Sequence, residues 1–167
     1  MLTPNLTVSA EGHLLIGGAD TAALAREHGT PLYVMDENMI RESCRGYNDV
    51  LRDEYAGRGL ICYASKAFSC KEIYRIVDSE GLGADCISDG EMHTALAAGM
   101  PAEKIVLHGN SKTDRELAMA VDQGIGRIVA DNLTELERLN MIAATSQKTA
   151  KILLRIKPGI DAHTHEF

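Results

Sequence analysis

The sequence predicts an α/β fold built around a parallel β-sheet. From Ile61 onward, short apolar strands alternate with amphipathic helices. Most of these helices begin with Ser, Thr or Asn followed three residues later by Glu, and several are followed by glycine. Strands that alternate with helices form βαβ units, and the strands of such units run parallel.

The expected strands cover residues 61–64, 84–87, 105–108, 127–130 and 152–156. They are apolar on both faces, so their sheet must be covered on both sides or closed. A doubly wound open sheet and a TIM-type (β/α)8 barrel both satisfy this condition. The regular repeat, and the lack of GxGxxG after the first strand, favour the barrel. Five of about eight units make the predicted barrel incomplete, and Ile87, Leu154 and Ile156 are expected to face its interior.

The helix starts share the capping-box pattern, in which a side chain and a Glu satisfy each other's backbone donors. The pattern occurs at Ser69–Glu72, Ser88–Glu91 and Thr113–Glu116, and in a looser form at Asn132–Glu135. Glycines 81, 99 and 124 suit the left-handed position after a helix. Helical spacing predicts buried faces made of Ile73, Ile76 and Val77, and of Leu133, Leu136, Leu139, Ile142 and Ala143.

The segment before Ile61 departs from the repeat. Residues 11–18 are expected to form a small strand and turn, and residues 30–37 another short strand. Asp36 is expected to cap a helix over 37–55, which residues 56–59 end. Its predicted inner face consists of Ile40, Tyr47, Val50 and Leu51. We therefore expect a boundary between residues 1–30 and the partial barrel of residues 31–167.

Composition and charge limit the possible functions. The chain of 167 residues is 45% hydrophobic and 25% charged, which is ordinary for a globular domain. Its net charge of -7 argues against nucleic-acid and anionic-membrane partners. No apolar run approaches the roughly 20 residues that span a bilayer, and the N-terminus does not read as a signal peptide. The four cysteines form no CxxC pair, which predicts a reduced, cytoplasmic protein without structural zinc.

Lys66 follows the strand at 61–64, at the edge where a barrel carries its functional groups. The residues alone leave two interpretations open. The lysine can be a strand-end side chain that reaches to solvent. It can also be a partly buried amine that forms a Schiff base with an aldehyde.

Neighbouring motifs favour the second interpretation. The stretch "YASKAFS" (63–69) resembles the lysine motif of the alanine-racemase-like, pyridoxal-phosphate-dependent decarboxylases. Further blocks resemble this family in order, namely 83–99, 104–120, 127–139 and 152–167. Within the family, "HGNSK" and "PGIDAHTH" resemble the branch that decarboxylates meso-diaminopimelate to L-lysine, the last step of lysine biosynthesis, rather than ornithine or arginine.

The resemblance assigns roles to individual residues. Lys66 would be the catalytic lysine that bonds to the pyridoxal 5'-phosphate aldehyde. Asp85 would lie close to it, and Arg155 would lie near the cofactor. His108 and Asn110 would line the site. Simpler interpretations are an electrostatic pair between Asp85 and Lys66, and an ion pair between Arg155 and Asp85.

Other motifs are less informative. Glu91 matches a family position near the site, but its capping role explains it. Asp89 and Phe68 depart from the glycine and asparagine that are usual in the family. The "HTHE" stretch (163–166) has the His-x-His spacing of a metal site. No third strand-end ligand accompanies it, so no metal is predicted.

The resemblance also implies what lies outside these residues. In the family, the phosphate and ring nitrogen are held by later strands, and residues 1–30 would contribute to an appended β-domain. We therefore expect a truncated portion of a carboxy-lyase that is inactive alone. The complete protein would be a homodimer that acts on an amino acid. The alternatives are a pyridoxal-phosphate-binding barrel without decarboxylase activity and a decarboxylase of the ornithine or arginine type.

Overall fold

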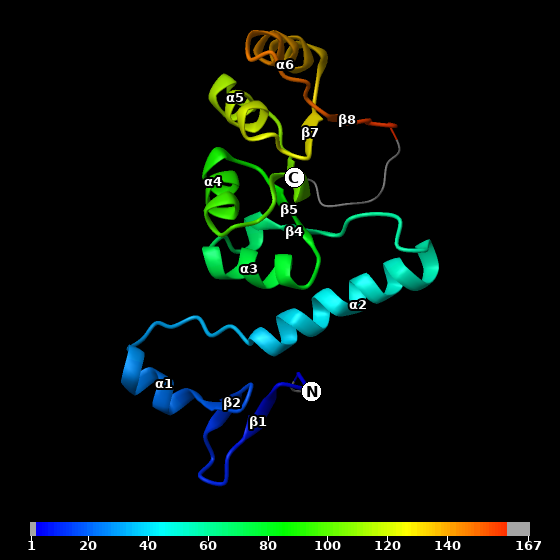
Figure 1. The fold of residues 1–167 in the computed structure, drawn as a ribbon. Coiled ribbons are helices and arrows are strands. Elements are labelled where there is room, and N and C mark those ends of the chain that lie inside the picture. Colours follow the sequence, from blue (N-terminus) through cyan, green and yellow to red (C-terminus); the bar gives the residue numbers. More distant parts are fainter. Residues whose placement is uncertain (1–2, 160–167) are drawn as a thin grey trace. The chain divides into compact units, whose positions relative to one another are not determined.

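The computed structural model describes residues 3–159 (Figure 1). The chain divides into two compact units at the junction of Gly59 and Leu60. The expected boundary between residues 30 and 31, which concerns an appended β-domain, stays a prediction. No helix in the described part of the chain is long and apolar enough to cross a membrane.

The first unit contains a small antiparallel sheet and two helices. Its elements are β1 (Leu6–Val8), β2 (Leu14–Ile16), β3 (Ala19–Asp20), α1 (Thr21–His28) and α2 (Glu37–Tyr55). The strand expected within 11–18 is present as β2, whereas α1 had no counterpart in the sequence analysis. The strand expected at 30–37 is wrong, because residues 32–36 have no regular structure. A strand needs a ladder partner, and none of the described strands pairs with this segment.

Helix α2 has the predicted bounds. The Asp36 side chain accepts hydrogen bonds from the backbone N–H groups of Asn38 (3.0 Å) and Met39 (3.4 Å). The helix ends at Ala56, whose φ of 52° is left-handed. The predicted inner face is wrong in part, because Tyr47 and Val50 are 65% and 55% exposed.

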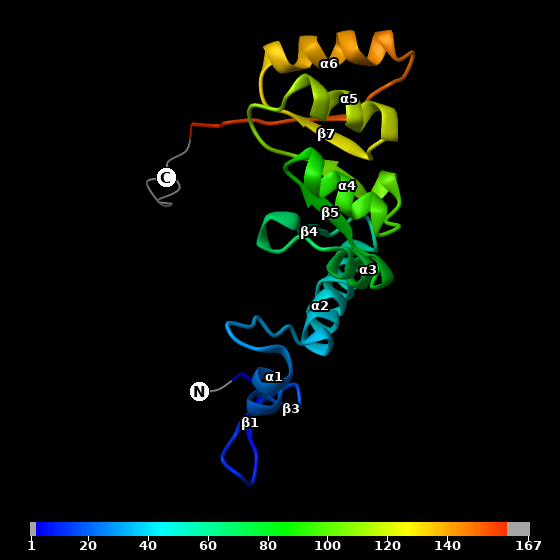
Figure 2. The same cartoon turned by 90° about the vertical axis from the view of Figure 1, so that its left-hand side faces the viewer.

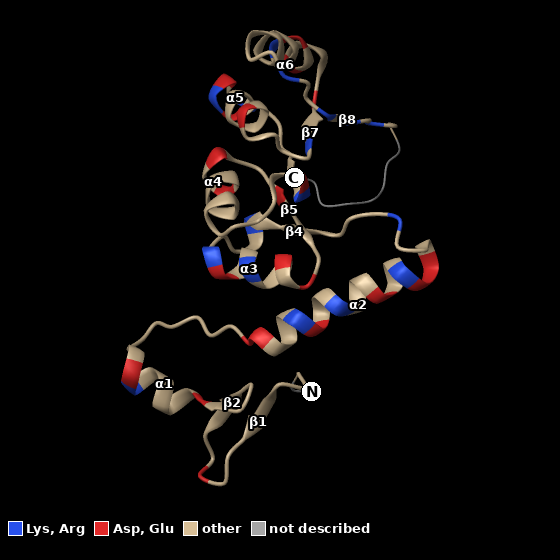
Figure 3. Ribbon diagram, in the orientation of Figure 1, with Lys and Arg blue, Asp and Glu red and all other residues tan. Residues whose placement is uncertain are grey.

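Charged residues of both signs alternate along α2 (Figure 3). Arg41 pairs with Glu37 at 2.7 Å, and Arg52 pairs with Asp49 at 2.6 Å. Such pairs one turn apart stabilise an exposed helix by a few tenths of a kcal/mol, about 0.2–0.5 each. This helix therefore carries no long stretch of one charge.

The second unit is a five-stranded parallel sheet whose strand order follows the sequence. The strands are β4 (Cys62–Ala64), β5 (Gly83–Cys86), β6 (Ile105–Leu107), β7 (Arg127–Ala130) and β8 (Ile152–Leu154). All five lie close to their predicted bounds. This arrangement agrees with the predicted partial barrel.

Helices connect these strands. They are the 3-10 turns η1 (Ser65–Ala67) and η2 (Ala102–Lys104) and the α-helices α3 (Lys71–Ser79), α4 (Asp89–Ala97), α5 (Asp114–Gln123) and α6 (Leu133–Thr145). Helices α3 to α6 lie side by side along one face of the sheet (Figures 1 and 2). This face is called the covered face below.

Strand alternation separates the covered face from the opposite one. The side chains on the covered face form the core and are at most 4% exposed, namely Ala84, Cys86, Ile105, Leu107, Ile128 and Ala130. The opposite face carries a row aligned by strand register, namely Ala64, Asp85, Val106 and Arg127. In a closed barrel this second face points to the interior, so it is called the inner face below.

The register corrects one detail of the prediction. Leu154 was expected on the inner face, but it pairs with Ala130 of the covered face. Side chains alternate along a strand, so Leu153 and Arg155 take the inner side instead. Ile156 follows the alternation of Leu154 and is also displaced from its expected side.

The helix starts follow the predicted pattern to different degrees. Thr113 and Glu116 form a complete capping box, with the Thr113 hydroxyl accepting from the Glu116 N–H at 3.2 Å. Ser88 accepts from the Glu91 N–H, but the Glu91 carboxylate accepts from the Ile87 N–H at 2.7 Å, one residue earlier than expected.

The expected cap at Ser69 is wrong. Helix α3 begins at Lys71, and the Ser69 hydroxyl instead lies 2.9 Å from the hydroxyl of Tyr74. The predicted burial of Ile73, Ile76 and Val77 is confirmed. In α6, Leu139 and Ala143 are buried, whereas Leu133 in the first turn is 77% exposed. The glycines expected after the helices have positive φ angles, namely 88° at Gly81, 96° at Gly99 and 67° at Gly124.

Candidate functional site

Lys66 lies in the short turn η1, directly after β4. Its side chain is exposed. The turn is anchored on both sides of the lysine. The buried Ser65 hydroxyl lies 3.4 Å from the Cys86 sulfur, and the Tyr63 hydroxyl donates to the Phe68 carbonyl at 3.0 Å. The amine is therefore presented at the carboxyl end of a strand on a defined turn.

Asp85 lies on the inner face of β5, between Ala64 and Val106 in the strand register. Its Oδ2 atom is 3.6 Å from Nδ1 of His108. Its Oδ1 atom is buried and has no hydrogen-bond partner among residues 3–159. Leaving a buried acceptor unsatisfied costs about 1–3 kcal/mol, so this oxygen is ready to accept from a ligand or a moving side chain.

His108 follows β6 directly. Its backbone N–H donates to the Cys86 carbonyl at 2.7 Å, which extends the parallel ladder by one bond. The next residue, Gly109, has a φ of 100°, so the chain turns away from the sheet at this point. The structure thus brings Asp85 and His108 together at neighbouring strand ends.

Arg155 follows β8 and also extends the ladder, through its N–H to the Ala130 carbonyl at 3.0 Å. Its guanidinium bonds the Asp131 carboxylate at 3.0 Å. The suggested ion pair with Asp85 is wrong, because β6 and β7 separate β5 from β8. Asp131 is a residue that the sequence analysis missed. Its position directly after the strand at 127–130 was the signal that could have identified it.

Burial keeps the neighbouring thiols and phenols neutral. Burial raises the pKa of Cys86 to about 11, while the hydrogen bond from Ser65 acts in the opposite direction. Burial also raises the pKa of Cys62, and the nearby Asp85 charge adds to this shift. The pKa of Tyr74 is raised by burial as well. The thiols of Cys62 and Cys86 and the phenol of Tyr74 therefore stay protonated near neutral pH.

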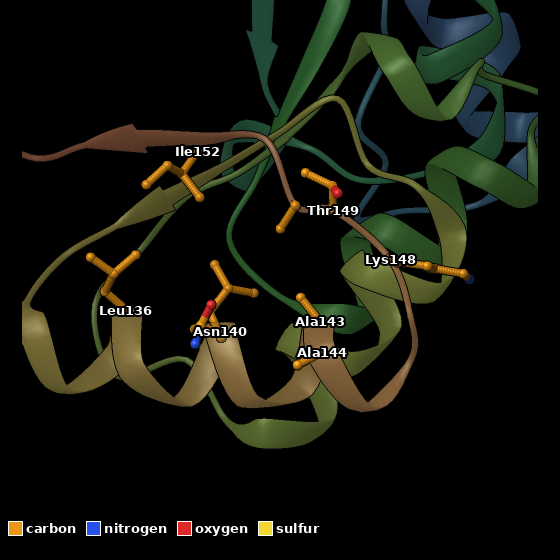
Figure 4. Close-up of a pocket in the computed structure, with 9 residues that line it drawn as sticks. Leu136, Asn140, Ala143, Ala144, Lys148, Thr149 and Ile152 are labelled. Carbon is orange, nitrogen blue, oxygen red and sulfur yellow. The ribbon is translucent and has the colours of Figure 1, made fainter.

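The pocket in Figure 4 lies away from these strand ends. It has a volume of about 330 Å³ and lies between α6 and the segment that enters β8. Its lining is largely aliphatic, including Leu136, Ala143 and Ile152. Lys148 points away from the cavity and donates to the Asp122 carbonyl at 2.7 Å. The pocket offers no reactive group.

No group of three or more potential metal ligands occurs within the described range of the chain. The "HTHE" stretch lies outside that range. The candidate site therefore consists of an amine, a carboxylate with an unsatisfied oxygen, an imidazole and a paired guanidinium. These groups follow the carboxyl ends of parallel strands or, for Asp85, lie within one.

A row of polar side chains at the carboxyl ends of parallel strands is typical of a domain that binds a small molecule at this edge. Residues 37–167 match the family described as pyridoxal-dependent decarboxylase, pyridoxal binding domain. The chain belongs to this family. Lys66 and the unsatisfied Asp85 oxygen fit such a cofactor, since one supplies the bonding amine and the other an acceptor for a protonated group.

Several similar curated proteins are diaminopimelate decarboxylases. The chain is 47% identical over 160 residues to the one from Bacillus methanolicus and 44% identical over 159 residues to the one from Bacillus subtilis. These matches cover 96% and 93% of this chain but only 37% and 35% of the relatives. The chain thus spans just over a third of the length of these relatives.

Solved structures confirm the fold. Diaminopimelate decarboxylase from M. jannaschii in complex with L-lysine aligns with a TM-score of 0.87 and 33% identity, over 99% of this chain and 39% of that one. AQ1208 from Aquifex aeolicus aligns with a TM-score of 0.86 and 38% identity, over 93% and 38% of the two chains. The five-stranded unit is therefore part of a decarboxylase barrel.

Proposed function

We propose that the complete protein carrying residues 1–167 decarboxylates meso-diaminopimelate to L-lysine, with pyridoxal 5'-phosphate bound to Lys66. The proposal rests mainly on the position of Lys66 at the end of β4 within a pyridoxal-binding domain. The identities of 47% and 44% to diaminopimelate decarboxylases support the choice of substrate.

When bound, pyridoxal phosphate acts as an electron sink for the bond that loses carbon dioxide. Lys66 would hold the cofactor through its amine. The Asp85 carboxylate would stabilise positive charge beside that amine, because its buried Oδ1 atom lacks another partner in the described structure. His108 would line the same edge next to Asp85.

Arg155 would contribute a fixed positive charge at the far end of the described sheet. Its guanidinium is held by Asp131, whose side chain is only 12% exposed. An arginine restrained in this way is suited to binding a carboxylate or phosphate oxygen with little loss of side-chain entropy. We assign it to the cofactor side of the site, as the family resemblance implies.

The proposal includes a homodimeric, cytoplasmic enzyme. No disulfide joins Cys44, Cys62, Cys70 and Cys86 within residues 3–159, which agrees with a reducing compartment. Lysine/ornithine decarboxylase from Vibrio vulnificus in complex with putrescine is a more distant structural match, with 26% identity and a TM-score of 0.71. Ornithine is therefore the competing substrate to test.

The cofactor position can be tested by chemical reduction. Treating the complete protein with pyridoxal phosphate and borohydride should leave a pyridoxyl group on the peptide that contains Lys66. The variant Lys66→Ala should not be labelled there, and Lys71→Ala serves as the matched control because this nearby lysine should be dispensable. Labelling of another lysine in the unmodified protein would refute the assignment.

The substrate can be tested separately. Carbon dioxide release should show a higher kcat/KM for meso-diaminopimelate than for ornithine or arginine. A preference for either of the latter would contradict the proposed substrate but not the role of Lys66. Cofactor binding without release from any of the three would instead identify a pyridoxal-binding protein that is not a decarboxylase.

A further inference from the structure

A buried ion pair joins the loop after β6 to the first turn of α6. The Nζ atom of Lys112 lies 2.8 Å from Oε1 of Glu135, and the two side chains are 1% and 3% exposed. Neither residue was among those expected to form the site. The pair connects two consecutive loops at the carboxyl edge of the sheet.

Each partner also bonds the backbone of a loop at this edge, Lys112 in its own loop and Glu135 in the loop before α6. The Lys112 ammonium donates to the Gly109 carbonyl at 2.5 Å. The Glu135 carboxylate accepts from the Asp131 N–H at 3.2 Å. The pair therefore fixes one peptide group in the loop after β6 and one in the loop after β7.

Both peptide groups adjoin residues of the candidate site. Gly109 follows His108, which lies 3.6 Å from Asp85. Asp131 holds Arg155 at 3.0 Å. A displacement of either peptide group would move one of these side chains. The ion pair thus links the imidazole on one strand end to the guanidinium two strands away.

Stability alone does not account for such a pair. Removing two charges from water costs several kcal/mol per ion, and apolar side chains of similar volume often replace a buried pair without loss of stability. Removal of only one partner is destabilising, because the other charge remains buried and unpaired. What apolar side chains could not replace is the orientation of the two peptide groups that this pair bonds.

We infer that Lys112 and Glu135 are positioning residues for the pyridoxal site. Their ion pair holds the loops that place His108 and the Asp131–Arg155 pair. The inference rests on the proposed function for its effect on catalysis. Its effect on the two loops can be measured without cofactor.

The chain contains a matched control pair. Lys104 of η2 and Asp78 of α3 also lie 2.8 Å apart, with side chains that are 31% and 28% exposed. Lys104 precedes β6, so this pair lies at the amino end of the strand whose carboxyl end carries His108. Disrupting it tests the loss of an ion pair without touching the two loops.

The experiment compares four variants of the complete protein, namely K112M, E135Q, the double variant K112M/E135L and the control K104M. Hydrogen exchange of the cofactor-free protein is measured on peptides that cover 108–112 and 131–135. We expect K112M and E135Q to raise exchange in both peptides and K104M to leave both unchanged. With cofactor, kcat of K112M should fall about tenfold or more, because small displacements of catalytic groups have effects of this size.

The double variant separates positioning from folding. It removes both charges, so its Tm should recover most of the value lost in K112M, whereas kcat should stay low because Gly109 and Asp131 lose their anchors. Recovery of both Tm and kcat would show that the pair serves folding only and would overturn the inference. Exchange that rises in only one of the two loops would also overturn it.

The proposed function and this inference fail in different ways. Absence of pyridoxal phosphate uptake by the unmodified protein would refute the proposed function, while the exchange data would still decide whether the pair anchors both loops. If K112M does not fold, E135Q supplies the same comparison, since it removes the charge of Glu135 with little change in side-chain volume. Equal kcat and exchange in E135Q and K104M would contradict the inference.

Discussion

Asp85 illustrates a conflict between stability and function within one side chain. Its buried Oδ1 atom has no partner in the described residues, and its Oδ2 atom lies 3.6 Å from a half-exposed imidazole. An acceptor left without a donor weakens the folded state. The arrangement has a use if the Asp85 carboxylate forms its missing hydrogen bond only when a ligand with a protonated group binds.

We expect Asp85→Ala to leave the free energy of unfolding of the cofactor-free protein unchanged or to raise it by about 1 kcal/mol, because an unsatisfied buried acceptor is removed. The same variant should weaken cofactor binding. Urea unfolding and titration with pyridoxal phosphate measure the two effects. A loss of stability well above 1 kcal/mol would mean that Asp85 already has its partner in the free protein.

Cys86 should make stability depend on pH in the alkaline range. Its pKa is raised by burial from 9.0 to about 11. Below the unfolded pKa the thiol is protonated in both states, so its stabilising contribution is fully present. As the pH rises from about 9 to 11, the unfolded chain loses this proton while the folded chain keeps it, so the free energy of unfolding falls.

The expected loss is roughly 2–3 kcal/mol across this window, since one pKa unit corresponds to about 1.4 kcal/mol. Urea unfolding at several pH values measures it. Cys86→Ala is the control, because Tyr63, Tyr74 and Cys62 also have raised pKa values and remain in that variant. An identical pH dependence in the variant would show that Cys86 does not contribute.

Sequence patterns were informative for residues at strand ends and uninformative about the burial of polar side chains in loops. Lys66, Asp85 and His108 could be located because a parallel strand fixes which edge its last residues reach. Lys112 could not, because a lysine in a polar loop is usually exposed. Only the fold shows that Glu135, from the next βα repeat, lies 2.8 Å from the Lys112 amine.

Among the elements, local patterns predicted the helices better than their exact caps. The complete box at Thr113 depends on residues three apart in sequence, which a sequence shows directly. At Ser88 and Asn132 the glutamate accepts from the residue before the cap instead. Which N–H group the glutamate accepts from depends on the backbone path between strand and helix. The sequence pattern does not reveal that path. At Ser69, the buried Tyr74 hydroxyl takes the side chain away from the helix start.

Two glycines provide a matched test of close backbone approach. A Cβ atom at Gly126, just before β7, would overlap the backbone carbonyl of Glu103. A Cβ atom at Gly90, within α4, would find its nearest neighbour 3.9 Å away. Gly126→Ala should therefore lower the free energy of unfolding by about 1–3 kcal/mol or more through forced backbone shifts.

Gly90→Ala should instead be neutral or stabilise by about 0.5–1 kcal/mol, because alanine restricts the unfolded chain and favours the helix. Chemical unfolding of both variants gives the comparison. Equal effects of the two substitutions would show that the Gly126 backbone can move away from Glu103 without loss.

For the whole molecule, the repeat predicted the strand order and the parallel sheet. It did not fix the register at the last strand. A shift of one residue exchanges the faces of a strand, and Leu153 and Leu154 are chemically alike. Their order on the two faces follows only from the pairing of Leu154 with Ala130. The short strand expected at 30–37 failed for a related reason, since pairing is decided by distant segments.

Residues 1–167 expressed alone should self-associate and lack decarboxylase activity. Strands β4 and β8 are both edges of the described sheet. Leu153 and Ile156 near the second edge are 48% and 74% exposed. Edges that combine unpaired backbone groups with apolar side chains promote association. A sizing column and a carbon dioxide assay with added pyridoxal phosphate measure both properties, and a monomer with turnover would contradict this expectation.

The sequential strand order also bears on how the chain acquires its structure during synthesis. Each strand from β5 to β8 pairs with the strand immediately before it. A newly made βα unit therefore finds its docking site already present and needs no segment that has yet to leave the ribosome. Folding can advance one unit at a time, with the youngest strand always at the growing edge. The ion pair of Lys112 and Glu135 can then form only after β7 and α6 have docked. The loop that carries His108 therefore gains this anchor from the βα repeat that is translated next.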